Sequence, residues 1–256
     1  MSGSIPDWAV RTEADRRALE QGCYWDQRRA DQIIRFAHAI FRPQYIDGRF
    51  RLLEWQAQCL SSLVAWRNFD GTRRFRFANI HLPKKQGKTL LVSLISAFEL
   101  LAAGVPSPFV VTGSVSKDNA GQVFAELAHT LRSLDPDRQW HQPTPNQKRL
   151  RIPGLNAEYR SLASDGDRVQ GYNCSLVVLD ECHAHKSSSL YDSLKYATIS
   201  RRDGLVVAIS TAGDDPSCYY HAIYEKSKRV ISGEGLDTTH YALQFKSEAD
   251  AEPEDP

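Results

Sequence analysis

One short segment has the residue types needed to hold phosphate groups. It contains Gly87, Lys88 and Thr89 directly after an apolar stretch. A glycine lets backbone N–H groups approach phosphate oxygens closely, and the start of a helix adds partial positive charge. Lys88 has the reach to contact the β- and γ-phosphates, and the Thr89 hydroxyl is a suitable Mg²⁺ ligand. The segment therefore predicts a nucleotide-binding loop.

The loop departs from the usual pattern of a glycine five residues before the Gly-Lys pair, because Leu82 stands at that position. A bare Gly-Lys-Thr occurs often by chance. What favours a phosphate site here is its place between a β-rich segment and an apolar helical one. The other loop residues expected at the phosphates are Pro83, Lys84, Lys85 and Gln86.

A second segment ends an apolar strand in two carboxylates, Asp180 and Glu181. Ligands of parallel sheets bind at the carboxyl ends of the strands. Asp180 is then placed to hold Mg²⁺, directly or through water, and Glu181 to orient and deprotonate an attacking water. Two solvated acids after a core strand are the alternative. Together with the upstream loop, however, the pair predicts a nucleoside triphosphatase.

Two further places have side chains suited to the same ligand. Ser210 and Thr211 end another apolar strand, where their hydroxyls are suited to sensing the γ-phosphate, although a helix cap would use the same residues. Gln56 follows Trp55 upstream of the loop, and its amide matches the donor and acceptor edge of adenine. For Trp55 the alternative is core packing.

The elements around these residues alternate between strand and helix, which predicts an α/β fold with a mostly parallel sheet. The expected helices span about Arg28–Phe41, Leu52–Trp66, Lys88–Ala103, Asp118–Leu134 and Ser217–Val230, with another starting near Ser189. The expected strands are Phe75–Leu82, Phe109–Thr112, Ser175–Asp180, Leu205–Ser210 and Tyr241–Phe245, with a hairpin or a pair of short strands over Leu150–Ile152 and Glu158–Leu162.

Composition is that of a soluble globular protein: 256 residues, 41% hydrophobic, 25% charged and a net charge of +1. No apolar run is long enough to span a membrane. With so little net charge, nucleic-acid contacts would have to come from local basic clusters, which otherwise are solvated faces. The two clusters are Arg73, Arg74 and Arg76, and Lys148, Arg149 and Arg151.

The five cysteines show no paired spacing and indicate reduced thiols. A metal site at Cys182, His183 and His185 is not favoured, because no second Cys/His pair has zinc-like spacing.

In this order, the motifs resemble the large terminase subunit of tailed bacteriophages, from about Asp26 to Phe245. That family typically lacks the first glycine of the loop and has a basic residue four before the lysine, here Lys84. It usually has Gln-Ala where this chain has Asn119-Ala120. The segments that carry the resemblance are Leu53-Glu54-Trp55-Gln56, Arg73 to Ile80 with Pro83 to Thr89, Val115 to Ala120, Gln170 to Asn173 before Leu176 to His185, and Ser210-Thr211-Ala212-Gly213.

The resemblance implies a P-loop ATPase of the additional-strand class, with a mostly parallel central sheet flanked by helices. It divides the chain into a helical lead-in (1–50), the ATPase core (51–246) and an acidic linker (247–256) toward a nuclease domain that this chain lacks. It implies ATP and Mg²⁺ as cofactors. The implied partners are double-stranded DNA, further copies in a ring, a portal protein and a small terminase subunit, in the host cell cytoplasm and without a membrane.

The resemblance also implies an arginine that completes a neighbouring subunit's site. Arg168 lies in a polar, glycine-containing segment shortly before the Asp180 strand. It is expected to act in catalysis with Glu181, Lys88 and Lys84; Arg160 and Arg201 are the alternatives. An exposed arginine paired with Asp165 or Asp167 remains open as the simpler interpretation.

Two other functions fit parts of the pattern. Asp180-Glu181-Cys182-His183 and Ser210-Thr211-Ala212 also fit a superfamily-2 DExH helicase or translocase. Such an enzyme needs a second RecA-like domain, which this sequence does not contain. The third possibility is a nucleotide-binding scaffold that does not hydrolyse ATP.

Overall fold

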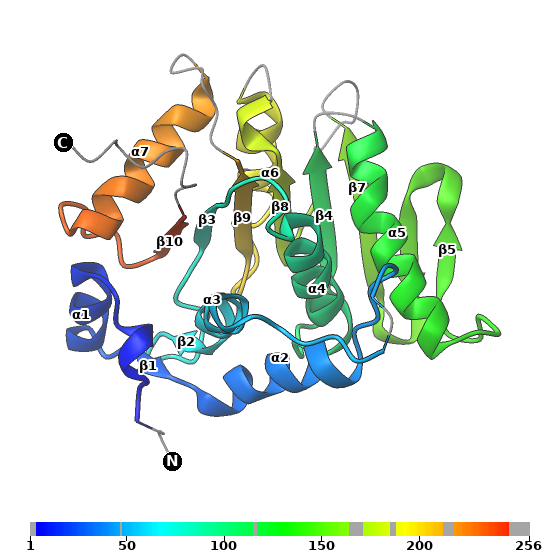
Figure 1. Ribbon diagram of the computed structural model, residues 1–256, viewed down its shortest axis with the longest axis horizontal. Coiled ribbons are helices and arrows are strands. Elements are labelled where there is room, and N and C mark those ends of the chain that lie inside the picture. Colours follow the sequence, from blue (N-terminus) through cyan, green and yellow to red (C-terminus); the bar gives the residue numbers. More distant parts are fainter. Residues whose placement is uncertain are drawn as a thin grey trace, which may run out of the picture.

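The centre of the molecule is an eight-stranded sheet, seen in the computed structural model of residues 4–46, 48–114, 117–163, 171–184, 188–211 and 218–245 (Figure 1). Its strand order is β10-β3-β9-β8-β4-β7-β6-β5. The strands are β3 (Phe77–His81), β4 (Phe109–Ser114), β5 (Gln142–Thr144), β6 (Arg149–Ile152), β7 (Ala157–Ala163), β8 (Leu176–Asp180), β9 (Leu205–Ser210) and β10 (His240–Gln244). Arg168 and the acidic linker at 247–256 lie outside the described residues.

Strands from β10 to β7 pair in parallel, and β6 and β5 add an antiparallel edge. Strand β9 lies between β3 and β8, which is the arrangement expected of the additional-strand class. The predicted hairpin is confirmed as β6 and β7. Strand β5 was not predicted, because Gln142-Pro143-Thr144 has no apolar pattern.

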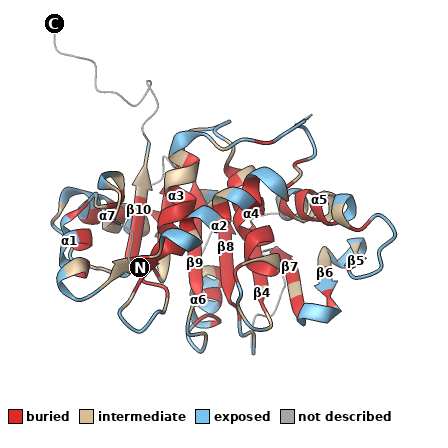
Figure 2. Cartoon of the chain, turned by 90° about the horizontal axis from the view of Figure 1, so that it is seen from below, coloured by how far each residue is buried: buried red, intermediate tan, exposed pale blue. Residues whose placement is uncertain are grey.

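Helices cover both faces of the sheet (Figure 2). Side chains alternate along each strand, so Val110, Val178 and Val207 belong to one core cluster and Val111, Val177 and Val206 to the other. The first face packs against α2 (Gln27–Ala39), α3 (Glu54–Ala65), α4 (Lys88–Leu101) and α5 (Lys117–Leu134). The second packs against α6 (Ser189–Tyr196) and α7 (Tyr219–Ser232). In the described part of the chain, no helix has the length and apolar character to cross a bilayer.

The N-terminal region packs into the same core as the sheet. Asp26 accepts hydrogen bonds from Arg28 N and Arg29 N and so begins α2. Phe36 of this helix meets Phe98 of α4 edge to face, with 5.5 Å between ring centroids. The region also contains α1 (Glu13–Glu20) and β1 (Tyr24–Trp25), and β1 pairs with β2 (Trp66–Arg67). The described residues also include the short 3₁₀ turns η1 (Asp7–Ala9), η2 (Pro145–Gln147), η3 (Pro153–Leu155) and η4 (Cys182–Ala184).

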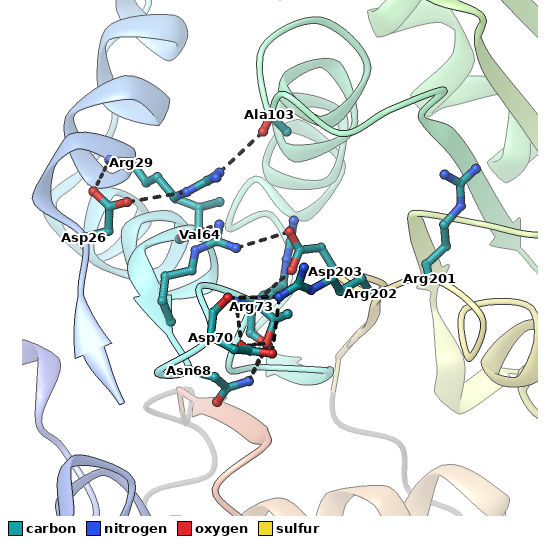
Figure 3. A network of polar contacts seen from close by, with 12 residues as sticks. Asp26, Arg29, Val64, Asn68, Asp70, Arg73, Ala103, Arg201, Arg202 and Asp203 are labelled. Carbon is teal, nitrogen blue, oxygen red and sulfur yellow. Dashed lines mark hydrogen bonds and ion pairs between the residues drawn. The ribbon is translucent and has the colours of Figure 1, made fainter. Parts of the chain in front are cut away.

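A polar network joins the loops at the amino ends of the strands (Figure 3). Asp203, just before β9, accepts a hydrogen bond from Arg73 N at 2.7 Å and lies 3.5 Å from Arg67 Nη1. Beside it, Arg202 Nη2 contacts the Asp70 carboxylate at 3.4 Å. The network fixes the entry points of β3 and β9, which are neighbours in the sheet.

The structure corrects both interpretations of the Arg73–Arg76 cluster. Arg73 and Arg74 are buried, with 2% and 1% of their surface exposed, so they form neither a solvated face nor a DNA-binding one. Arg73 pairs with Glu99 of α4 at 3.1 Å, and Arg74 pairs with Asp15 of α1 at 2.7 Å. Arg76 donates to backbone carbonyls in the turn before β9. In the second basic cluster, Arg149 is paired with Glu158.

The Arg73–Glu99 pair predicts a specific effect on stability. Glu99→Ala leaves the guanidinium charge of Arg73 buried without its partner, which costs about 3–5 kcal/mol. We expect the free energy of unfolding, measured with urea, to fall by that amount. The double variant Arg73→Met, Glu99→Leu should regain most of the loss, since no charge remains buried. An unchanged free energy of unfolding in Glu99→Ala would show that the pair does not hold the chain before β3 to α4.

Candidate nucleotide site

The predicted phosphate loop joins β3 to α4. Leu82 N donates to Ser210 O at 3.0 Å, which continues the pairing of β3 with β9. Beyond it the chain turns sharply, with Lys85 and Gly87 at φ of 66° and 74°. Gly87 is the residue directly before α4, and its left-handed conformation favours glycine. The loop thus brings the first N–H groups of α4 to the carboxyl edge of the sheet.

Lys88 and Glu181 meet across this edge. Lys88 is buried in the first turn of α4, and its Nζ lies 3.6 Å from Glu181 Oε1. Glu181 follows β8 and has φ of 52°, a conformation that costs energy for a residue other than glycine. Hydrogen bonds hold it there, from its own N–H to Asp180 Oδ1 and from Ala184 N to its carbonyl, both at 2.9 Å. The backbone at the end of β8 therefore directs a carboxylate toward the phosphate loop.

Asp180 occupies the last position of β8 and is nearly buried. Burial, together with the neighbouring charge of Glu181, raises the pKa of the Asp180 carboxyl to about 6. The charge of Lys88 opposes this shift. A carboxylate in such a place is stabilised by a cation, which fits the predicted role of a metal ligand.

His183 is part of the site, although the sequence had not assigned it a role. Its Nδ1 lies 3.2 Å from Glu181 Oε2 and 2.7 Å from Ser210 Oγ, and Thr211 Oγ1 is 3.4 Å away. The same imidazole therefore connects the ends of β8 and β9. The signal that could have shown this is its position two residues after Glu181, where the turn η4 brings it back to the sheet edge.

A cleft of about 1010 Å³ opens over these groups. It is lined by most of the predicted phosphate-loop residues, and also by Glu181 and Thr211. The opposite walls come from the segment before α3 and from α5, which the sequence did not indicate. The predicted residues in the lining are Lys84, Lys85, Gly87, Lys88, Thr89, Glu181 and Thr211; the others include Pro43, Gln44, Tyr45, Ile46, Gly121, Gln122, Ala125, Glu126 and His183.

The other predicted site residues at this edge are next to lining residues in the sequence: Pro83, Gln86, Asp180 and Ser210. Gln56 lies behind the lining: the side chain is 5% exposed, and its Oε1 accepts from Leu53 N at 3.0 Å, as a cap of α3. Trp55 packs against Phe245, with ring centroids 5.4 Å apart. The structure thus brings together the phosphate loop, the two acids and the hydroxyls, with Gln56 one layer deeper.

The two alternative arginines are both bound within the chain. Arg160 pairs with Glu158, donates to Tyr172 Oη at 3.0 Å and lies over the Phe109 ring. Arg201 donates to the carbonyls of Pro106, Ser107 and Asn173 at the amino edge of the sheet. Neither guanidinium is free to enter another subunit's site without losing these contacts.

A model of the terminase large subunit ATPase domain matches residues 54–229, which include every site residue above except the segment before α3. The chain belongs to this family. The comparison with curated protein sequences found no match to this chain.

Solved structures show the same fold. The large terminase of bacteriophage HK97 superposes with a TM-score of 0.71 at 23% identity, over 88% of this chain and 45% of that one. The ATPase domain of the Thermus phage P74-26 large terminase superposes with a TM-score of 0.51 at 19% identity, over 65% of this chain and 74% of that one. The UvsW helicase of bacteriophage T4 superposes with a TM-score of 0.50 at 10% identity, over 87% of this chain and 68% of that one. With the family assigned, the helicase alternative is not favoured.

The position of Lys88 gives a direct test of the terminase nucleotide site. Lys88→Ala removes the buried ammonium from the phosphate side of the cleft, so we expect weaker ATP binding and loss of ATP hydrolysis. Lys228→Ala is the matched control, because Lys228 lies on α7 outside the cleft lining, in an exposed pair with Glu225. Calorimetric titration and phosphate release measure the two effects. Unchanged hydrolysis in Lys88→Ala would remove the phosphate-loop assignment.

Proposed function

We propose that this domain hydrolyses ATP to drive double-stranded DNA into procapsids, as the motor of a packaging terminase. The observation that carries the proposal is the meeting of Lys88 and Glu181 at the carboxyl edge of the sheet, inside the cleft. ATP binds with its phosphates on the loop from Lys84 to Thr89. Lys88 then exchanges its contact with Glu181 for the β- and γ-phosphates, which frees the carboxylate to accept a proton from water.

Thr89 and Asp180 are suited to hold Mg²⁺ at this place. Thr89 lines the cleft, and Asp180 is the nearly buried carboxylate whose pKa is raised to about 6 by burial and by Glu181. Mg²⁺ in phosphoryl-transfer sites keeps several waters and few protein ligands, so a hydroxyl and one carboxylate are sufficient. When bound, the ion neutralises charge on the β- and γ-phosphate oxygens.

Glu181→Gln separates binding from chemistry. The amide keeps the size and hydrogen bonding of the side chain but cannot take the proton from water. We expect ATP affinity to be retained and turnover to fall by about a hundredfold or more. Asp192→Asn, an acid on α6 outside the cleft, is the control. If Glu181→Gln hydrolyses ATP like the parent, Glu181 is structural, and a parent protein without turnover would favour a nucleotide-binding scaffold.

The wider assembly follows from the same proposal. Several copies act as a ring on a portal protein, a small terminase subunit brings the DNA, and the complex works in the host cell cytoplasm. Residues 1–50 serve as a lead-in, 51–246 as the ATPase core and 247–256 as a linker. Cleavage of DNA belongs to a separate nuclease domain, so this chain should not cut DNA. The contacts from Ser210 and Thr211 to His183 give the loss of phosphate a path toward neighbouring segments.

In the ring, Arg168 would complete a neighbour's site. A positioned arginine raises the rate of phosphoryl transfer by about a thousandfold or more. With Arg160 and Arg201 held within their own chain, Arg168 is the better candidate of the three.

Mixing two inactive variants tests this arrangement. Arg168→Ala retains Glu181, and Glu181→Gln retains Arg168, so mixed rings contain some complete interfaces. We expect each variant alone to be inactive under assembling conditions and the mixture to recover ATP hydrolysis. Full activity of assembled Arg168→Ala would show that this arginine does not act in trans.

A further inference from the structure

The segment from Arg42 to Ile46, called the strap below, forms one wall of the nucleotide cleft. It follows α2 and runs along α5 before the chain turns toward α3 (Figure 1). Arg42 N donates to Thr130 Oγ1 at 3.2 Å, and Thr130 Oγ1 donates to Arg42 O at 3.0 Å. Gln44 N donates to Glu126 Oε2 at 2.9 Å and its Nε2 to Ala125 O at 3.2 Å. The strap is thus held in place by α5.

These anchors leave two apolar side chains at the cleft. Tyr45 is 91% exposed and Ile46 is 40% exposed, and both line the cleft with Gly87, Thr89 and Leu90. The Tyr45 ring is therefore largely open to solvent, on a segment whose backbone is anchored. Its place beside the first turn of α4 is where a ligand extending from the phosphate loop would pass.

Gln56 is badly placed to hold the adenine by comparison. Its Oε1 is committed to Leu53 N, and the side chain does not line the cleft. The Gln56 Nε2 instead lies behind Gly87, 3.5 Å from the position that a Cβ on that glycine would take. To use both its oxygen and its nitrogen on the edge of a base, Gln56 would have to give up its cap of α3.

We infer that the nucleoside of the bound nucleotide lies on the strap, with the base stacked on Tyr45 and in contact with Ile46. The inference rests on the proposed ATP site and extends it to the part of the ligand beyond the phosphates. Every base has a face suited to aromatic stacking, so the contact favours a nucleotide over bare phosphates without reading the edge of the base. Glu126 is a positioning residue, because its carboxylate fixes the strap through Gln44 N.

Comparing ADP with inorganic pyrophosphate isolates the nucleoside contribution, and neither ligand requires turnover. Both affinities are measured by calorimetry with Mg²⁺ present. The parent protein should bind ADP more tightly than pyrophosphate. In Tyr45→Ala the ADP affinity should fall about five- to a hundredfold, on the scale of one base–aromatic contact, with the pyrophosphate affinity unchanged. Tyr45→Phe should retain the preference, since the stacking face remains.

Phe69→Ala is the matched control. Phe69 is also a highly exposed aromatic residue, at 82%, but its neighbours in the chain, Asn68 and Asp70, belong to the polar network at the opposite edge of the sheet (Figure 3). It should leave both affinities unchanged. Equal affinities for ADP and pyrophosphate in the parent, or an unchanged ratio in Tyr45→Ala, would overturn the inference. If Gln56→Met loses the preference for ADP over pyrophosphate and Tyr45→Ala keeps it, the base lies at Gln56 instead.

The same titrations separate this inference from the proposed function. Lys88→Ala should weaken both ligands, because both carry the phosphates that Lys88 contacts. If Lys88→Ala weakens both and Tyr45→Ala changes neither, the phosphate site stands and only the strap is wrong. If Lys88→Ala changes neither ligand, the proposed ATP site itself fails.

Discussion

Lys88 and Glu181 follow strands that are not neighbours, and they meet because β9 is inserted between β3 and β8. In the parallel register His81 lies opposite Ser210, and Asp180 lies opposite Ile209. The three strands therefore end within about one residue of each other, at the same edge. A change of register would move the carboxylate one strand step, about 3.3 Å, from the lysine and turn it to the other face of the sheet. The chemistry proposed for this domain depends on that alignment.

The same edge connects the site to α7. His183 contacts both Glu181 and Ser210, and its carbonyl accepts a hydrogen bond at 3.4 Å from Sγ of Cys218, the residue directly before α7. Burial raises the pKa of Tyr220, so the hydroxyl stays protonated and able to donate. Tyr220 lies in the first turn of α7, and its ring stacks near His81, the last residue of β3. The contacts run from the carboxylate to a helix on the other face without a break. They are the physical basis on which a change at Glu181 would alter the packing of α7.

The parts that sequence could predict are those set by local pattern. The stretch of β8 from Leu176 to Leu179 is buried on both faces of a parallel sheet. Such a strand is apolar at every position, so the sequence shows it as a continuous apolar run. The strand–loop–helix around Lys88 follows from the glycine and the apolar helix after it. For His183 the local pattern offers only its position two residues after Glu181, and for the strap it offers nothing. Their roles depend on contacts with Ser210 and Glu126, which are distant in sequence, and Arg73 looked like a surface residue until its pairing with Glu99 was seen.

The two edges of the sheet differ in what holds them. At the amino edge, Asp203 fixes the starts of β3 and β9, and nearby the buried Arg73–Glu99 pair ties the chain before β3 to α4. At the carboxyl edge, the chain carries an acid with a raised pKa and a glutamate in a left-handed conformation, both of which cost stability. Such costs are tolerated only where the surrounding structure over-determines the backbone. Buried contacts at the amino ends of β3 and β9 thus allow the unfavourable geometry that the proposed catalysis requires at the carboxyl edge.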